Sequence, residues 1–472
     1  MSDSNRVSLS WTEEATWGVL PGATALQNLN FTSESFAFNL TNTQSENIRS
    51  DRNIADLIQN GADCSGGFNF EFQASNIDNF LQGALWASAW TTRIIADAAI
   101  TIGATNVDDT YTHTGAPGWD TLLEVGQWIL VSGYVNGANN GYFAITGVTP
   151  TTIVVGAGGT LVDEAATPAV TIKTFAQAND VTVDETASVY TYTSAALIDW
   201  TKQDLTVGQW IKVAGFTTAG NNGFCQVRSI TATILTVVGL TLTDEIAGDT
   251  VTFSPCDFIK NGTTENSYYF ERAHADITQF FQFAGMVPNS LSMTASANAI
   301  MTGSLEFIGK DATLTQATAG TGSNTAAVAT PIMNAVSNVG QVMVDNVVVT
   351  SCLVQEISFT LNNNVRGLSS IGTLGNCDIG VGSVEVTGNL NAYFKDETFY
   401  DRYLAATAFA LSFKVEDASN NAYIVSFGNC KIESDAINAT GINTDVMENM
   451  SFRAILDSTY TNAAIEISRI LA

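Results

Sequence analysis

Residues 31–90 read FTSESFAFNLTNTQSENIRSDRNIADLIQNGADCSGGFNFEFQASNIDNFLQGALWASAW, and the hydrophobic periodicity of this stretch decides the fold. Apolar side chains alternate with polar or small ones in residues 36–40 and again in residues 68–72, which predicts two strands with one buried face each. Residues 77–85 place apolar side chains at helical spacing. The stretch therefore predicts a strand, a long polar excursion, a second strand and a short helix.

The same succession returns late in the chain. Residues 357–361 alternate, a polar arm follows over 362–380, residues 384–394 alternate again, and KDETFYDRYLAAT closes as a helix. The segments that follow each helix also agree in order, although few residues are identical. The sequence therefore predicts one architectural unit that occurs twice.

A second repeat lies between the two units. The segments EVGQWILVSGYVNGANNGYFAITGV and TVGQWIKVAGFTTAGNNGFCQVRSI place Trp128 and Trp210 in register, 210 − 128 = 82 residues apart. Each copy is expected to be a small β module with an Asn-Gly turn of type I′ between strands. Trp128 and Trp210 are predicted to anchor the cores of their own modules, and sugar stacking is the alternative use of such tryptophans.

These patterns divide the chain into arms, units and modules. The insertion is placed after the first helix, because the short stretch FALSFKVEDASNNAY occupies that joint in the second unit. Insertions are tolerated at exposed tips, so the modules are expected to project from the main body. The predicted limits are 1–29 for an N-terminal arm, 30–93 with 262–311 for the first β-sandwich unit, 94–177 and 178–261 for the modules, 312–340 for a loosely held linker, and 341–472 for the second unit.

Composition favours a mainly β protein and excludes some functions. The 46 acidic and 18 basic residues give a formal net charge of −28, which argues against the basic footprint of a usual nucleic-acid binder. Six scattered cysteines without a CxxC pair indicate free thiols made in a reducing cytoplasm. No apolar run reaches membrane-spanning length, and we expect no signal peptide.

No catalytic constellation can be assembled from the sequence. His113 and His274 stand in dissimilar settings without ligands at metal spacing, and no nucleotide-binding or hydrolase motif occurs. The Asp-Glu pairs at 163–164 and 244–245 are expected to be solvated. We therefore expect no enzyme activity, no cofactor and no metal.

Two exposed arms should find partner surfaces. Trp11 and Trp17 on the N-terminal arm need a surface that covers them, in the same subunit or in a neighbour. The excursion from Thr41 to Asp63 is too long for a plain hairpin loop. It carries the charged residues Glu46, Arg49, Asp51 and Arg52.

In this order, ATWGVLPG at 15–22, the arm ENIRSDRNIADL at 46–57 and DNFLQGALW at 78–86 resemble tail tube proteins of long-tailed bacteriophages. The resemblance extends over roughly residues 10–90 and 265–472. It implies a β-sandwich with a flanking helix, and inner sheets that join edge to edge into rings. It also implies that these rings stack into a hollow tube, with the long arm (Glu46, Arg49, Asp51, Arg52) reaching the next ring.

The resemblance further implies a virion protein that is made in the host bacterial cytoplasm. Its expected partners are other copies of itself, other tail proteins at the tube ends, and double-stranded DNA that passes through an acidic lumen without specific binding. Two units per chain resemble the arrangement in which three chains form a pseudo-sixfold ring, and the modules resemble accessory domains that decorate tails. The alternative is a secreted or surface adhesin or carbohydrate-binding β protein, which would need a secretion signal or an anchor.

Overall fold

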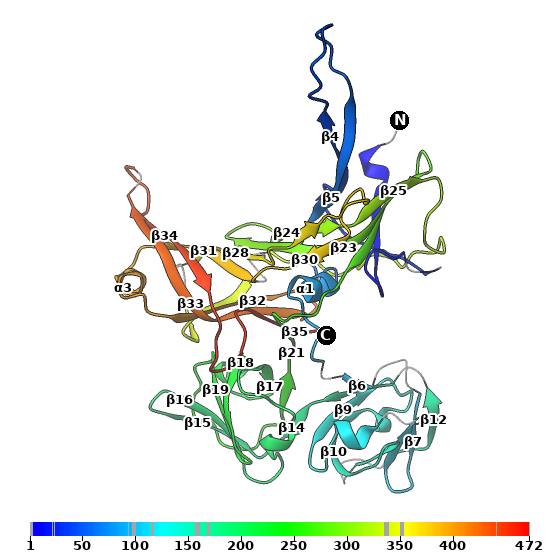
Figure 1. Ribbon diagram of the computed structural model, residues 1–472. Coiled ribbons are helices and arrows are strands. Elements are labelled where there is room, and N and C mark those ends of the chain that lie inside the picture. The colour runs from blue at the N-terminus through cyan, green and yellow to red at the C-terminus, as the bar shows by residue number, and fades with distance from the viewer. Residues whose placement is uncertain are drawn as a thin grey trace.

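The computed structural model describes residues 3–20, 22, 24–92, 94–96, 101–113, 115, 118–155, 161–167, 170–334, 339–349, 354–439 and 441–471. The predicted mainly β class is confirmed, because antiparallel sheets account for most of these residues. Figure 1 shows a wide body of packed sheets, two smaller β modules on one side of it, and one hairpin that projects on the other side.

The elements follow the order that the sequence predicts. The first unit contains β1 (Val7–Glu13), β2 (Gln27–Asn28), β3 (Ser33–Glu34), β4 (Ala37–Gln44), β5 (Leu57–Glu71), α1 (Asp78–Ala84), β22 (Tyr268–His274), β23 (Gln279–Ser296), β24 (Thr302–Gly309) and β25 (Asp311–Thr315). The second contains β26 (Val339–Val344), β27 (Val347–Val348), β28 (Val354–Asn362), β29 (Arg366–Leu368), β30 (Asp378–Gly380), β31 (Glu385–Tyr393), α3 (Thr398–Ala405), β32 (Phe409–Glu416), β33 (Ala422–Asn438), β34 (Met447–Ala454) and β35 (Glu466–Ile470).

The modules have separate sheets. The first is built from β6 (Ile94–Ala96), β7 (Ile102–Thr105), β8 (Thr110–His113), α2 (Trp119–Leu122), β9 (Trp128–Ser132), β10 (Gly141–Val148), β11 (Thr152–Val155), β12 (Glu164–Thr167) and β13 (Thr171–Thr174). The second is built from β14 (Ala176–Ala178), β15 (Val181–Thr186), β16 (Val189–Ser194), β17 (Trp210–Ala214), β18 (Gly223–Ile230), β19 (Ile234–Val238) and β20 (Val251–Pro255).

A shared β-bulge gives the residue correspondence between the two units. The register of β23 against β24 shifts at Asn289, and the register of β33 against β34 shifts at Glu433, so these strands correspond at an offset of 433 − 289 = 144. This offset places Phe283 on Phe427, and both side chains are buried in the core. Because bulges are specific features of a sheet, a bulge at the same place supports a duplicated unit.

The remaining strands and the helices correspond at their own offsets. Leu305 pairs with Phe68 in the first unit, and Met450 pairs with Leu390 in the second, which relates β5 to β31 at 390 − 68 = 322. Ala37 pairs with Ser65 in the first unit, and Thr360 pairs with Thr387 in the second. Because Ser65 corresponds to Thr387 at the offset of 322, Phe36 corresponds to Phe359 at an offset of 323. One continuous cluster of buried apolar side chains runs through both units.

The stretch that the sequence analysis took as a short joint is a strand. Residues 409–416 form β32, which pairs with both β26 and β33 and corresponds to β22 of the first unit. The insertion therefore lies between a helix and the strand after it. The chain leaves the modules through β21 (Asp257–Lys260), which pairs with β35 in the second unit.

The segment between the two units is held against the first unit. Met333 is fully buried, Gln73 Nε2 donates to the carbonyl of Thr330 at 2.8 Å, and Asn30 Nδ2 donates to the carbonyl of Val328 at 2.8 Å. The small, polar residues of this segment gave no sign of these contacts. The predicted limits of the linker and of the other domains stay predictions.

The N-terminal arm pairs with a strand of its own chain. β1 pairs with β22, and the Trp11 ring lies 4.6 Å from the ring of Phe80 in α1. Trp17 Nε1 donates to the carbonyl of Gly285 at 2.9 Å, and Lys310 lies over the Trp17 ring. Both tryptophans therefore find their surface within the same subunit.

Candidate functional site

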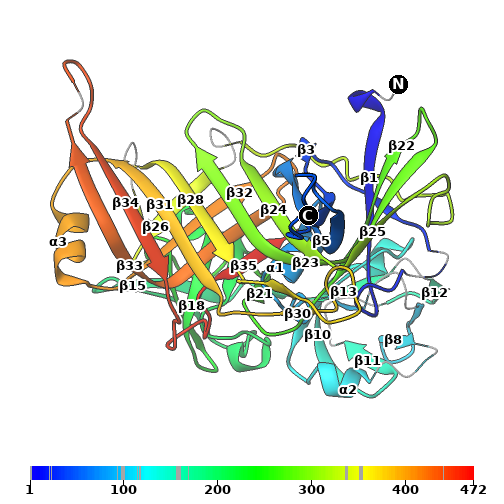
Figure 2. The same ribbon diagram turned by 45° about the horizontal axis from the view of Figure 1, so that its top comes forward.

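The two units share one sheet. β23 pairs with β28 over seven residues, from Ser290 opposite Asn362 to Ser296 opposite Glu356. Figure 2 shows β34, β31, β28, β23 and β24 side by side in this sheet, which β5 extends at one end and the second half of β33 at the other. We call it the shared sheet, and we call the pairing of β23 with β28 the seam.

One face of the shared sheet is polar. Phe68, Leu291, Leu305, Phe359 and Phe452 belong to the buried core on one side, so strand alternation places their sequence neighbours on the other side. These neighbours are nearly all small and uncharged. They include Ser65, Asn69, Ser290, Ser292, Thr294, Thr302, Ser304, Ser358, Thr360, Thr387, Asn389, Asn391, Ser434, Asn438, Asn449 and Ser451.

The charges on this polar face are mainly negative. Glu71, Glu306, Glu356 and Glu385 alternate with core residues and stand on this side, where Arg453 is already paired with Glu385 and with Glu433. Such a surface offers phosphate groups few free cations, and its acids repel them. The face is suited to lie next to a polyanion without binding it.

Both ends of the shared sheet are unpaired within the described part of the chain. β4 pairs with β5 alone, and the second half of β33 pairs with β34 alone. Open edges of this length recruit other strands unless something covers them. Because the two units correspond strand by strand, the two open edges are complementary to each other. β33 stands where β23 stands in the seam, and β3 with β4 stands where β28 stands.

The long excursion is a two-stranded ribbon. β4 and β5 stay paired out to Gln44 opposite Leu57, and the ribbon rises from the body in Figure 1. Its outer part exposes apolar side chains as well as charges: Ile48 is fully exposed, and Ile54, Leu57 and Ile58 are more than half exposed. These apolar side chains were not predicted, because in the sequence they stand singly among polar and charged residues.

The arm charges partly satisfy one another. Arg49 donates three hydrogen bonds to Asp51, Nη2 to Oδ2 at 2.7 Å and Nε to Oδ1 at 3.0 Å and to Oδ2 at 3.3 Å. This pair holds the pKa of Asp51 at about 2. Glu46 and Arg52 are exposed in the same loop, and Arg52 has a positive φ of 63°. The loop at the tip of the ribbon therefore carries one internal ion pair beside exposed charged and apolar side chains.

The counterpart arm of the second unit does not project. Its strands β29 and β30 form a short hairpin that lies on the first unit, where Val365 and Ile379 pack with Trp86 and Val287. Asn376 Nδ2 also donates to the carbonyl of Gly309 at 2.8 Å. In one unit, then, the hairpin at this position already buries apolar side chains against a neighbouring unit.

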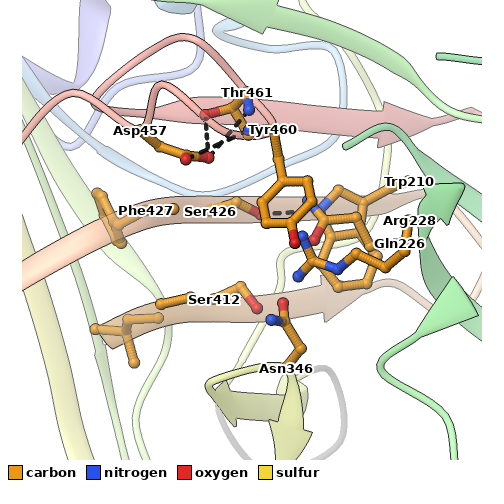
Figure 3. A pocket seen from close by; sticks show the side chains of 13 residues that line it. Trp210, Gln226, Arg228, Asn346, Ser412, Ser426, Phe427, Asp457, Tyr460 and Thr461 are labelled. Carbon is orange, nitrogen blue, oxygen red and sulfur yellow. Dashed lines mark hydrogen bonds between the residues drawn. The ribbon is translucent and has the colours of Figure 1, made fainter. Parts of the chain in front are cut away.

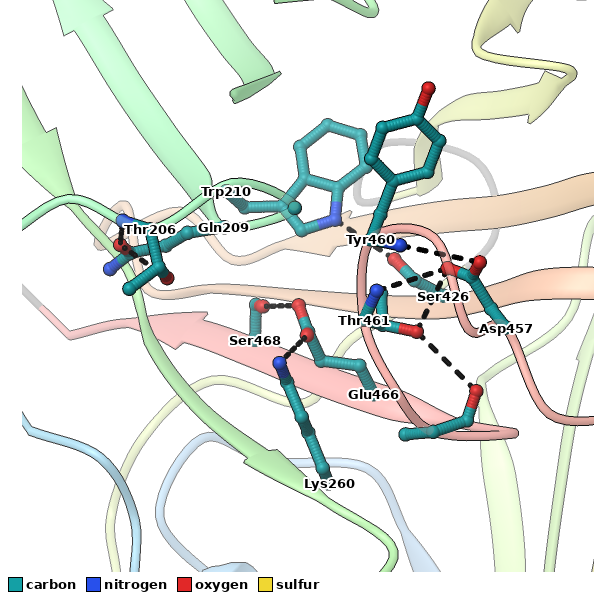
Figure 4. Close-up of polar contacts among 12 residues, drawn as sticks. Thr206, Gln209, Trp210, Lys260, Ser426, Asp457, Tyr460, Thr461, Glu466 and Ser468 are labelled. Carbon is teal, nitrogen blue, oxygen red and sulfur yellow. Dashed lines mark hydrogen bonds and ion pairs between the residues drawn. The ribbon is translucent and has the colours of Figure 1, made fainter. Parts of the chain in front are cut away.

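The tryptophan of the second module lies outside that module's core. Trp210 Nε1 donates to Ser426 Oγ of β33 at 2.9 Å (Figures 3 and 4). The Trp210 ring packs with Met343 and Ile424 of the second unit. The same interface contains Arg228, which lies 3.9 Å from the centre of the Tyr460 ring. The core-anchor interpretation is therefore revised: Trp210 joins the module to the body, because β17 faces the body on this side.

The loop that carries Tyr460 is shaped by one carboxylate. Asp457 accepts hydrogen bonds from the backbone amides of Thr459, Tyr460 and Thr461 and from the Thr461 hydroxyl, as Figure 4 shows for the last two residues. Burial acts against the charged form, but these donors lower the pKa of Asp457 overall. The ionised side chain thus fixes the loop against the module.

Trp128 is also at a joint. It packs against the core of the second module, and its Nε1 donates to the carbonyl of Leu197 at 3.0 Å. The core of its own module is instead built around Tyr111 and Trp119. Trp128 therefore attaches the first module to the second module, just as Trp210 attaches the second module to the second unit. This interpretation replaces the predicted core anchor for Trp128 too.

In each module, the glutamate of the Asp-Glu motif binds the loop that carries the Asn-Asn-Gly motif. Glu164 accepts hydrogen bonds from the amides of Val135 and Asn136 and from Asn139 Nδ2, and Glu245 does the same with the residues of the second copy. The connection is a longer loop with a 3-10 turn (Gly137–Asn139), so the expected two-residue type I′ turn is wrong. The glutamates bind that loop and are not merely solvated.

No catalytic or metal-binding arrangement stands out in the part of the chain that the structure describes. His113 Nδ1 accepts from the amide of Gly115, and the ring of His274 stands edge-on to the ring of Phe281. Among the described residues, no group of three or more His, Cys, Asp and Glu side chains could hold a metal ion. None of the described helices is long and apolar enough to cross a membrane.

Comparison with known proteins agrees with this geometry. The sequence profile of the family described as phage tail tube protein matches residues 4–454, which is nearly the whole chain. The chain therefore belongs to the phage tail tube protein family, a structural component of the virion tail. No curated protein matches the sequence significantly.

Proposed function

We propose that this protein is the building block of a phage tail tube, assembling into rings that stack around the path of the genome. The observation that carries the proposal is the shared sheet, which has a polar, acidic face and an open edge at each end. A closed ring removes both edges, and it can place the polar face around a lumen.

Three chains make the ring. Each chain supplies two units that are already joined through the seam, so three copies provide six units with pseudo-sixfold symmetry. The join between chains repeats the seam. The second half of β33 takes the place of β23, and β3 with β4 of the next copy takes the place of β28.

The projecting arm from Thr41 to Asp63 joins one ring to the next. Its exposed isoleucines need a surface that covers them, and the counterpart hairpin of the second unit buries its own apolar side chains against a neighbouring unit. Double-stranded DNA passes through the lumen without specific binding, and other tail proteins bind the ends of the tube. The protein is made in the host cytoplasm and has no enzymatic role.

Electron microscopy and native mass spectrometry of the purified full-length chain test the proposal. The expected result is rings or tubes, with isolated rings of three chains. Six chains per ring would overturn the trimer but keep the tube. Dispersed monomers at all concentrations and salt conditions would overturn the proposed function itself.

A further inference from the structure

The helices of the two units occupy equivalent places but differ in exposure. The offset of 322 that relates β5 to β31 also places Ile77 on Phe399 at the start of the helices, and both are buried. Within α1, Asp78, Phe80 and Leu81 are buried, and Asn79 is exposed. In α3, by contrast, Tyr400, Tyr403 and Leu404 are exposed, the last of them by 65%.

The second unit covers the start of α1, whereas Trp11 and Tyr268 of the first unit pack on Phe80 in the same helix. Tyr423 Oη in β33 donates to Asp78 Oδ1 at 2.7 Å, and Arg469 in β35 forms an ion pair with the same carboxylate. The Tyr423 ring also stands edge-on to Phe72 at 5.1 Å between ring centres. The start of α1 is thus docked onto the outer sheet of the neighbouring unit within the chain.

The matching place on the first unit is partly uncovered, with Arg272 and His274 of the same unit against the Phe281 ring. Val425 pairs with Ile467 beside the α1 contact, and at the offset of 144 the corresponding pair is Phe281 with Leu314. Ile467 is 1% exposed, whereas Leu314 is 55% exposed. The first unit therefore carries an exposed apolar residue beside Gln279 and Gln316, which are the counterparts of the α1-binding residues Tyr423 and Arg469.

The two uncovered surfaces lie at opposite ends of the body. Figure 2 shows α3 beyond β34 at one end and β25, which carries Leu314, at the other. A second copy placed head to tail brings α3 of one chain onto β25 of the next. This contact is continuous with the edge of β33, where the ring join is proposed.

We propose that an exposed apolar surface, formed by Tyr400 and Tyr403 of α3 and by Phe394 just after β31, docks onto Phe281 and Leu314 of the next copy. The occupant is a second copy of this chain, and the contact is an apolar version of the ionic contact that α1 makes within the chain. This contact rests on the proposed ring and adds a second interface between neighbouring chains beside the strand pairing. We call this second interface the latch. Tyr400 stands where α1 has Asp78, so the latch and the α1 contact differ in chemistry at corresponding positions.

A charge design tests the latch directly. Tyr400→Asp is expected to raise the concentration needed for half-maximal ring formation by about tenfold, as for an aromatic anchor worth about 1.4 kcal/mol. Gln316 stands one step beyond the last paired residue of β25, at the place that corresponds to Arg469. Adding Gln316→Arg rebuilds the Asp78–Arg469 pair between chains and is expected to recover most of the loss, whereas Gln316→Arg alone is expected to change little.

A photo-crosslinking side chain at Tyr403 of the full-length protein locates the contact. Adducts between chains are expected on residues 279–316, identified by mass spectrometry. Adducts on the modules, no adducts in wild-type-like rings, or Tyr400→Asp rings that form at the wild-type concentration would each overturn the latch. If the unmodified chain forms no rings at all, the proposed function fails first. Thermal unfolding of each variant as a monomer shows whether its fold is retained.

Discussion

Ser292 Oγ and Thr360 Oγ1 lie 2.9 Å apart on the polar face of the seam. At the offsets of 144 and 323, the corresponding residues are Ala436 on β33 and Ala37 on β4. The distance between the two hydroxyls shows how closely side chains approach at this register position. The proposed join between chains therefore has a defined register, and Ala436 should face Ala37 of the next copy.

The first prediction tests this register by disulfide formation. Ala37→Cys with Ala436→Cys is expected to link chains covalently under mild oxidation, because paired positions of neighbouring strands bring Cβ atoms into disulfide range. Exposed Cys377 is replaced by Ser in this background, as is Cys352, which lies outside the described residues. The linked species are read on a denaturing gel. Ala37→Cys with Ile437→Cys is the control one residue out of register, and equal linkage of both pairs would refute the join.

The second prediction concerns the arm. Ile48→Ser with Ile54→Ser is expected to shorten tubes while leaving rings intact, because these exposed apolar side chains are proposed to be covered by the next ring. Arg49→Glu with Arg52→Glu should have the smaller effect, since Arg49 is already paired with Asp51 within the arm. Tube length is measured by electron microscopy. Hydrogen exchange should show residues 45–56 protected in tubes and unprotected in subunits, and equal protection in both states contradicts the idea.

The third prediction is a pH dependence of stability. Glu448 is buried on β34, and burial together with the negative charge of Asp435, to which Asp396 adds, raises the pKa of Glu448 to about 8. A carboxyl whose pKa is raised in the folded state contributes stability below its ordinary pKa, and that contribution is lost as pH rises towards 8. Glu448→Gln should therefore gain stability relative to wild type as pH increases from 5 to 9. Thermal unfolding across this range measures it, and a constant difference between the two proteins would be inconsistent with the assignment.

The fourth prediction separates the modules from assembly. Removing residues 93–255 and joining Thr92 to the segment before β21 keeps the bridge between Thr91 and Phe258, so the main body should fold. Rings are expected to form, because the shared sheet contains no module residues. The deletion uncovers Met343 and Ile424, and Ile424→Ser is added to keep this face soluble. A soluble, folded deletion variant that makes no rings would show that the modules belong to the ring contact.

The fifth prediction tests the joint between module and body. Trp210→Ala removes a buried ring and the hydrogen bond to Ser426, and it should weaken the docking of the second module by about 3 kcal/mol. Limited proteolysis should then cut faster near residue 256, while ring formation stays unchanged. Trp128→Ala is the matched control, because it should loosen the first module alone. Unchanged proteolysis of the Trp210 variant would contradict the joint.

Strand alternation was enough to predict the mainly β class. The phenylalanines of residues 68–72 have one buried face whatever lies opposite, and the 82-residue repeat is visible in identical letters. The partner of a buried side chain could not be predicted. Trp210 begins an alternating strand and would look the same in its own core as it does against Ser426 of another unit.

The polar face of the shared sheet could not be predicted from the sequence either. Serines and threonines that alternate with core residues, such as Ser292 and Thr360, have the pattern of any solvent-facing strand. Their significance comes from the seam, which depends on a pairing between residues far apart in the chain. The exposed isoleucines of the arm were missed because Ile48 and Ile54 stand among charged neighbours with no period.

The seam also bears on how such a ring would form. Because β23 and β28 belong to one polypeptide, their pairing is intramolecular and does not depend on how concentrated the chains are. In a three-chain ring every second join is thus complete before any encounter, and dilution can open only the joins between chains. The covalent link also fixes the stoichiometry at one pair of modules for every two units, so each ring displays its modules at alternate positions without any sorting of subunits.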